Sequence, residues 1–189
     1  DGKAQLTVAY EDDKPRYVKT IVISAQHTEN VCPDCMERDS YQNVVLKAVP
    51  MELLALKTRV LINPSGCFVA GGPAADTGLT GRKLAVDQYG PVAHIGGGAL
   101  SGKDATKVDR SVAYMARYIA KNLVYAGLAD RCEIQIVYAI GKAEPVSVSV
   151  ESFGTSSLTN GELAQLVLAV FDMRPAAIIG KLGLRKSIY

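Results

Sequence analysis

The feature that most restricts the fold is a glycine-dense stretch, residues 66–102, in which neither helical nor strand periodicity can be followed. Patterns of regular structure stand on both sides of it. A loop of this length inside a compact protein is usually functional or disordered. We therefore expect two regions of regular structure, joined by a stretch whose residues serve a site rather than a core.

The region before the loop is predicted to contain strands on either side of a helical segment. Residues 5–10 alternate between apolar and polar side chains, and residues 17–24 are rich in β-branched side chains, so the two predict a hairpin around a polar turn. Residues 40–56 have mixed apolar spacing interrupted by Pro50, which indicates helical pieces. A short strand is predicted at 58–62.

Regular patterns resume after the loop with an amphipathic helix, whose apolar residues from Val108 to Leu123 recur at steps of three and four. Thr106 and Asp109 have the spacing of a capping box at its start, and Gly127 suits its end.

Two strands and a second helix follow. Residues 133–140 alternate as a strand and 146–150 form the next one, while Thr159 and Glu162 again have capping-box spacing before a helix at 163–171. Residues 180–189 show little pattern. Because pairs of strands alternate with helices, the chain is predicted to be α+β rather than a doubly wound parallel fold.

The four cysteines include one close pair, Cys32-Pro-Asp-Cys35, with the spacing of half a zinc site or of a redox pair. A zinc site needs two further ligands. Cys67, Cys132 and the two histidines form no second pair, so free thiols in a reducing compartment are expected.

Four segments in and after the loop, residues 71–76, 78–83, 96–104 and 107–110, carry glycine, lysine, arginine and aspartate close together. Glycine lets backbone N–H groups converge on an anion, and lysine and arginine supply the countercharge for phosphate. The spacing favours a phosphate site, and a purely structural glycine loop stays open. It matches neither a Walker A loop nor a dinucleotide fingerprint.

Carboxylates in the same segments are candidates for Mg²⁺, which takes one or two protein carboxylates together with substrate phosphates. They are Asp76, Asp104 and Asp109. The last two also fit residues favoured by a helix dipole.

These segments resemble the methionine adenosyltransferase (S-adenosylmethionine synthetase) family over nearly the whole chain. The motifs are Asn-Pro-Ser-Gly at 63–66, Gly-Gly-Pro at 71–73, Asp-Thr-Gly-Leu-Thr-Gly-Arg-Lys at 76–83, Gly-Gly-Gly-Ala-Leu-Ser-Gly-Lys-Asp at 96–104 and Lys-Val-Asp-Arg-Ser at 107–111. The resemblance implies two similar two-layer α/β domains with mixed sheets, from a family of three intertwined repeats. Residues 1–69 would be an N-terminally incomplete central domain, and 70–189 a C-terminal domain with phosphate-binding loops.

The resemblance also implies the reaction. Such enzymes join ATP and L-methionine by sulfur attack on ribose C5′, then hydrolyse triphosphate to pyrophosphate and phosphate, with Mg²⁺ required and K⁺ activating. It implies catalytic roles for Lys3, Arg82, Lys83, Lys103 and Lys107. The ATP-binding set would be Lys3, Cys67, Phe68, Asp76, Arg82, Lys83, Ala99 and Lys103. Methionine would lie near Asp76, Lys107 and Ile140, and Asp109 would bind the metal.

Two positions depart from the family pattern. His94-Ile95 stands where Arg-His is usual, and Cys67 stands where an arginine is usual. Nothing in the chain matches the family's N-terminal domain, so this portion alone is expected to be inactive. The alternative is a non-catalytic binding or regulatory subunit that pairs with a longer homologue.

The resemblance further implies a cytoplasmic homodimer or homotetramer with shared active sites. The net charge of +2 does not suggest nucleic acid as a partner, and no apolar run is long enough to suggest a membrane span.

Overall fold

A computed structural model describes residues 1–188 and divides the chain into two compact units, Asp1–Gly78 and Leu79–Tyr189. The first unit holds a mixed three-stranded sheet, and the second holds an antiparallel two-stranded sheet with three helices. The α+β class is confirmed, although the sheet of the second unit is antiparallel rather than mixed.

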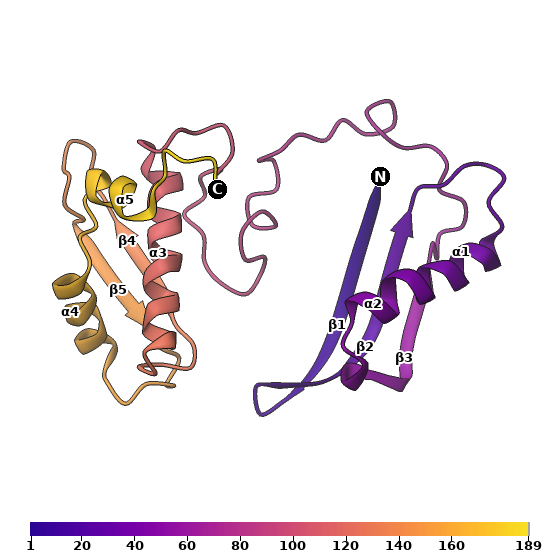
Figure 1. Ribbon diagram of the computed structural model, residues 1–189, viewed down its shortest axis with the longest axis horizontal. Coiled ribbons are helices and arrows are strands. Elements are labelled where there is room, and N and C mark those ends of the chain that lie inside the picture. Colours follow the sequence, from indigo (N-terminus) through magenta and orange to yellow (C-terminus); the bar gives the residue numbers. More distant parts are fainter. Residues whose placement is uncertain (189) are drawn as a thin grey trace. The chain divides into compact units, whose positions relative to one another are not determined.

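The sheet of the first unit begins with the predicted hairpin, which is confirmed. Strand β1 (Gly2–Glu11) pairs antiparallel with β2 (Lys14–Ala25), and β3 (Leu54–Ile62) lies parallel to β2 on the other side (Figure 1). Asp12 and Asp13 form the turn with φ of 50° and 57°. Two left-handed residues are what a two-residue hairpin loop needs, and aspartate tolerates that conformation.

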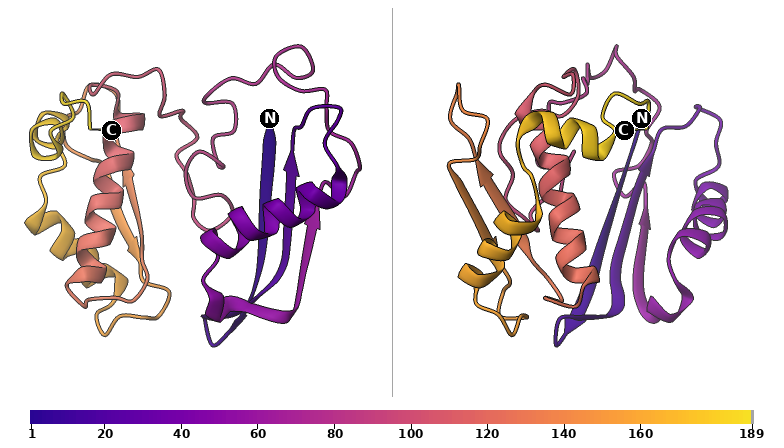
Figure 2. Two further views of the ribbon diagram at one scale, coloured as in Figure 1. Left: turned by 45° about the vertical axis from the view of Figure 1, so that its right-hand side comes forward. Right: turned by 60° about the vertical axis from the view of Figure 1, so that its left-hand side comes forward.

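One helical segment crosses a single face of this sheet, as the right-hand view of Figure 2 shows. It runs through α1 (Pro33–Ser40), the π-helix η1 (Tyr41–Val45) and α2 (Leu46–Ala48). The short 3₁₀ helix η2 (Met51–Leu53) follows Pro50. Val45 packs there against Val18 and Ile21 of β2. The segment begins earlier than the predicted helical pieces at 40–56.

In the second unit, the long helix α3 (Val108–Tyr125) runs beside β4 (Glu133–Val137), and α4 (Asn160–Val170) beside β5 (Ser147–Glu151) (Figures 1 and 2). A further helix, α5 (Pro175–Leu182), packs on α3. Met115 and Ile119 of α3, Leu163 of α4 and Ile178 of α5 are buried in one core. Burial of these apolar side chains drives the three helices onto the β4–β5 sheet.

The glycine-dense stretch is irregular, as expected. Between the end of β3 at Ile62 and the start of α3 at Val108, the described chain forms turns, bends and extended irregular segments, without a helix or strand. The end of α3 is also confirmed. Gly127 has φ of 70°, and the N–H groups of Gly127 and Leu128 donate to the carbonyls of Val124 and Leu123, which is a Schellman motif.

The two predicted capping boxes have opposite outcomes. At α4 the box is confirmed, because the Thr159 hydroxyl accepts from the Glu162 N–H while the Glu162 carboxylate accepts from the Thr159 N–H. At α3 it is wrong. The helix starts at Val108 with Lys107 as its N-cap and no side-chain cap, because the Thr106 hydroxyl donates to Asp104 instead.

Two further details correct the sequence analysis. The alternation predicted for 133–140 ends early, because β4 stops at Val137 and a turn closed by the Lys142 N–H to the Ala139 carbonyl leaves Ile140 fully exposed. The tail predicted to lack pattern contains the end of α5, which stops at Gly183 with φ of 63°.

No single helix among the described residues has both the length and the apolar character of a membrane span. Only α4 and α5 taken together pass that test, and they are bent by 78° at their junction.

Candidate functional site

The centre of the candidate site is the Lys103–Asp109 ion pair next to the glycine loop of the second unit, a name we use for residues 94–103. Lys103 Nζ lies 2.7 Å from Asp109 Oδ2, with the lysine side chain 24% exposed and the carboxylate 55% exposed. Lys103 ends the loop, and Asp109 lies in the first turn of α3. Two of the predicted site residues are therefore brought into direct contact.

Gly98 explains how the loop approaches this pair. A Cβ at this position would lie 2.6 Å from Asp109 Cγ and 2.8 Å from its Cβ and Oδ2. Any other side chain would therefore displace the aspartate. The glycine is required by close packing here, because its φ lies outside the left-handed region.

Asp104 is held beside the same helix start by neighbours that stabilise its charge. It accepts hydrogen bonds from the Thr106 hydroxyl and N–H at 2.5 and 2.8 Å, and Lys107 Nζ lies 3.2 Å away. The Thr106 hydroxyl, the Thr106 N–H and then Lys107 lower the pKa of Asp104 to about 2. Asp104 is therefore an anion already committed to local partners.

A second cationic segment lies against the loop. A Cβ on Gly81 would meet Ser101 Oγ at 2.8 Å and the Cβ of Ala99 at 3.4 Å, so the backbone at Gly81 runs beside residues 99–101. Arg82 and Lys83 follow Gly81 and are exposed, and neither forms an ion pair within residues 1–188. Their charges are available to an anion at this loop.

Two residues that hold the loop were not given a role from sequence. Arg110 Nη1 donates to the Lys103 carbonyl at 2.5 Å, which fastens the end of the loop to α3. Glu133 accepts from the N–H of His94 at 3.0 Å and from its Nδ1 at 2.8 Å, which fastens the beginning. The pKa of Glu133 is lowered, chiefly by that backbone N–H. Arg110 belongs to a motif segment, residues 107–111, and Glu133 ends another segment that resembles the family, residues 127–133, but neither segment indicated that these side chains hold the loop.

The first unit presents Phe68 from a segment held by His27. The His27 N–H donates to the Phe68 carbonyl at 2.9 Å, and the Phe68 N–H donates to His27 Nε2 at 3.1 Å. Since His27 Nδ1 lies 2.8 Å from the Thr28 carbonyl, which can only accept, the imidazole is the neutral Nδ1–H tautomer. Beside it, the side-chain amide of Gln26 donates a hydrogen bond to the Val69 carbonyl at 2.9 Å.

The remaining predicted residues of the first unit are exposed. Lys3 lies in β1 opposite Ser24, Cys67 precedes Phe68, and the Asp76 N–H donates to the Gly72 carbonyl at 3.0 Å. These residues and Phe68 belong to one unit, and Arg82, Lys83, Ala99, Lys103, Lys107 and Asp109 to the other.

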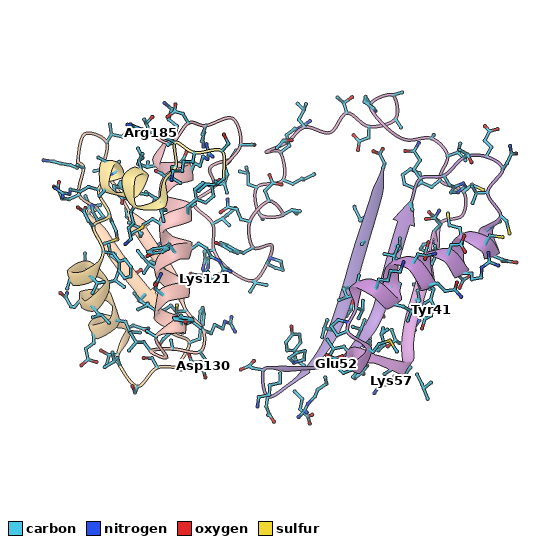
Figure 3. The ribbon with its side chains drawn as sticks, in the orientation of Figure 1. Tyr41, Glu52, Lys57, Lys121, Asp130 and Arg185 are labelled. Atoms are coloured by element: carbon cyan, nitrogen blue, oxygen red, sulfur yellow. The ribbon has the colours of Figure 1, made fainter. Side chains whose placement is uncertain are left out.

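Ile140 lies fully exposed in the turn after β4. A shallow hollow of the second unit, of about 470 Å³, is lined by residues that include Lys121 and Asp130 (Figure 3). Lys121 lies about 18 Å along α3 from Asp109 at 1.5 Å per residue, so this hollow is separate from the glycine loop.

A metal ion at the loop would find Asp109, because the neighbouring carboxylate of Asp104 is already held by Thr106 and Lys107. Among residues 1–188, no three His, Cys, Asp or Glu side chains gather into a metal-binding group. Asp109 nevertheless keeps more than half of its side-chain surface open. This donor set suits Mg²⁺, which is commonly bound through one or two carboxylates and the substrate's phosphates.

Comparison with known proteins places both units in one family. Residues 1–68 match the sequence model of the S-adenosylmethionine synthetase central domain, and residues 70–189 match that of the C-terminal domain. Over all 189 residues the chain is 56% identical to the S-adenosylmethionine synthase of Clostridium botulinum (strain Alaska E43 / Type E3). The chain spans about half of that relative, 48% of its length.

Proposed function

Because the chain belongs to the S-adenosylmethionine synthetase family, we propose that it supplies the nucleotide- and phosphate-binding groups of a methionine adenosyltransferase. The reaction would form S-adenosylmethionine from ATP and L-methionine and then hydrolyse the triphosphate. The observation that carries the proposal is the Lys103–Asp109 pair next to the glycine loop, with Gly98 packed on Asp109.

The proposed reaction requires cationic groups positioned at the triphosphate. When the methionine sulfur attacks C5′ of the ribose, the C5′–O bond breaks and the whole triphosphate leaves with its negative charge. Cations that are already in place stabilise that developing charge without reorganising. Arg82, Lys83 and Lys103 are the groups we assign to the phosphates, with the backbone at Ala99 beside the nucleotide.

Asp109 is the residue we assign to Mg²⁺, and the open face of its carboxylate supports the assignment. When bound, Mg²⁺ neutralises charge on phosphate oxygens. Lys103 already neutralises part of the Asp109 charge, so a cation at Asp109 would leave Lys103 free to turn to a phosphate. K⁺ completes the proposed cofactors, and no residue of this chain is assigned to it.

The first unit would bind the nucleoside. Phe68 would pack against the adenine, since an aromatic ring offers a flat apolar face. Its backbone is fixed at both the N–H and the carbonyl by His27, which supports a positioned rather than a mobile ring. Lys3 and Cys67 complete the ATP contacts.

Methionine would lie near Asp76, Lys107 and Ile140. The ammonium group of Lys107 is paired with Asp104 in the structure, so it would have to leave that carboxylate to contact methionine. We further propose that the protein acts in the cytoplasm as a homodimer or homotetramer with shared active sites, with neither nucleic acid nor membrane as a partner.

A chimera tests the proposal. Residues 1–189 would replace the matching part of the Clostridium botulinum relative, whose identity of 56% over this range favours a correctly folded hybrid. We expect the chimera to form S-adenosylmethionine from ATP and L-methionine with Mg²⁺ and K⁺. Lys103→Met should abolish the activity, and Lys121→Met, on the same unit but away from the loop, should retain it.

Failure has a specific meaning. A chimera that is folded, binds ATP and forms no product would refute the enzyme assignment and favour the non-catalytic binding or regulatory subunit. The unmodified relative, assayed alongside, shows that the conditions are adequate.

A further inference from the structure

Cys32 and Cys35 occupy the start of α1, outside the site described above. Cys32 is the N-cap of the helix, Pro33 follows at its first position, and Cys35 lies in the first turn. The Cys35 N–H donates to Cys32 Sγ at 3.4 Å. The two sulfur-bearing residues therefore share one turn of backbone, with the first sulfur already directed toward the second residue.

The two thiols differ in exposure and in acidity. Cys32 is exposed and Cys35 is half-buried. Hydrogen bonds from the Cys35 side chain, the Cys35 N–H and the Asp34 N–H lower the pKa of Cys32, whereas burial and the negative charge of Asp34 oppose that shift. The bond to Cys32 raises the pKa of Cys35, as do burial and Asp39, whereas Arg38 lowers it. Cys32 is thus suited to attack as the thiolate, and Cys35 to remain protonated until a disulfide forms beside it.

We propose that Cys32 and Cys35 form a reversible dithiol–disulfide site that exchanges with small-molecule disulfides. Residues three apart on a helix have Cβ atoms about 5–6 Å apart, whereas a disulfide needs ~4 Å. Because Cys32 is the N-cap, its backbone dihedrals lie outside the helix and can change to close this gap.

The exchange proceeds in two balanced steps. The Cys32 thiolate attacks one sulfur of the small-molecule disulfide, and that disulfide's bond breaks to release one thiolate and leave a mixed disulfide. Cys35 then loses its proton to solvent, and its sulfur attacks Cys32 Sγ to release the second thiolate. The protein dithiol gives two electrons to the small-molecule disulfide, which is reduced to two thiols.

The chain contains its own controls. Cys67 is exposed like Cys32 but lies in the irregular segment after β3, and the cysteine nearest to it in the sequence, Cys35, is 32 residues away. Cys132 is half-buried, and burial raises the pKa of its thiol. Cys67 should therefore react more slowly and keep whatever adduct it gains, and Cys132 should react least.

The test treats the 189-residue chain with glutathione disulfide, blocks free thiols by alkylation at intervals, and follows intact mass and mapped peptides. In the wild type we expect a Cys32–Cys35 disulfide, seen as the loss of two hydrogen atoms with no glutathione retained at either residue, and reversed by dithiothreitol. The Cys35→Ser variant should trap glutathione on Cys32 severalfold faster than on Cys67. In Cys32→Ser, where serine preserves an N-cap and hence the helix, Cys35 should react slowly.

Two results would overturn the proposal. One is a wild-type chain in which Cys32 keeps glutathione as persistently as it does in Cys35→Ser. The other is a rate at Cys32 no greater than that at Cys67. Neither depends on the assigned enzyme activity, so the outcome leaves the proposed function untouched.

Discussion

Replacing Gly98 by alanine tests whether the loop is built around Asp109. The new Cβ would meet Asp109 Cγ at 2.6 Å, whereas ordinary contacts begin at 3.4 Å, so the aspartate must move by about 0.8 Å. The contact also involves the Asp109 Cβ, so rotation of the carboxylate alone cannot relieve it. A misplacement of about 1 Å in an active site can cost roughly 100-fold in rate.

The effect on stability should be much smaller than the effect on rate. The Lys103–Asp109 pair is partly exposed, and exposed ion pairs contribute only about 0–1 kcal/mol. The assay is S-adenosylmethionine formation by the chimera, together with urea unfolding. We expect an approximately 100-fold lower rate in Gly98→Ala, with a free energy of unfolding lowered by no more than about 1 kcal/mol.

Gly96 provides the matched control. It lies in the same glycine run, its φ is outside the left-handed region, and a Cβ there would meet nothing within 4 Å. Gly96→Ala adds the same methyl group without the collision and should keep most of the activity. Equal rates for the two variants would refute the role given to Gly98.

Three further predictions concern the core, one carboxylate and the Phe68 segment. Ile119 of α3 is fully buried, so Ile119→Ala should lower the free energy of unfolding by about 2–5 kcal/mol in urea titrations, whereas Val124→Ala on the 40% exposed position of the same helix should cost under about 0.5 kcal/mol. An NMR titration should place the pKa of Asp104 near 2, so its contribution to stability is complete above pH 3.8 and is lost as the pH falls toward 2; a midpoint at 3.8 would contradict the hydrogen-bonded geometry. His27→Ala removes the acceptor for the Phe68 N–H, worth about 1 kcal/mol, and should raise the KM for ATP of the chimera about fivefold with kcat little changed; an unchanged KM would separate His27 from nucleotide binding.

Elements with strong local signals were predictable from sequence, and those without them were not. The hairpin and α3 follow from alternation and an apolar stripe. In contrast, α1 is polar on average and buries no residue, so it lacks the apolar stripe that marks α3, and its start is set by the Cys32 cap and by Pro33. The short α5 consists largely of apolar residues, so it lacks a contrasting polar face, and its sequence did not distinguish it from an irregular tail.

Residue types at the site were predictable, but their contacts were not. Glycine beside lysine and aspartate indicated an anion site, yet only the folded loop shows that Gly98 packs on Asp109 and that Glu133 holds His94. Such contacts depend on the path of an irregular chain, which local propensity does not specify. The failed capping box at Thr106 has the same origin, because its hydroxyl had two possible partners and donates to Asp104.

The pairing of Lys103 and Lys107 with carboxylates also indicates how the loop stays intact before an anion arrives. Lys103 is paired with Asp109 and Lys107 with Asp104. Each carboxylate offsets the positive charge of its lysine, which reduces the repulsion between the two ammonium groups. An incoming triphosphate must then compete with these carboxylates for the lysines. Asp109→Asn removes one of these competing carboxylates, so the variant should bind inorganic triphosphate more tightly in calorimetry without divalent cation. In the chimera, the same substitution should make the rate of S-adenosylmethionine formation depend less on the Mg²⁺ concentration. If both quantities stay at the wild-type level, Asp109 neither restrains Lys103 nor binds the metal, and the assignment of this pair to the phosphate site fails.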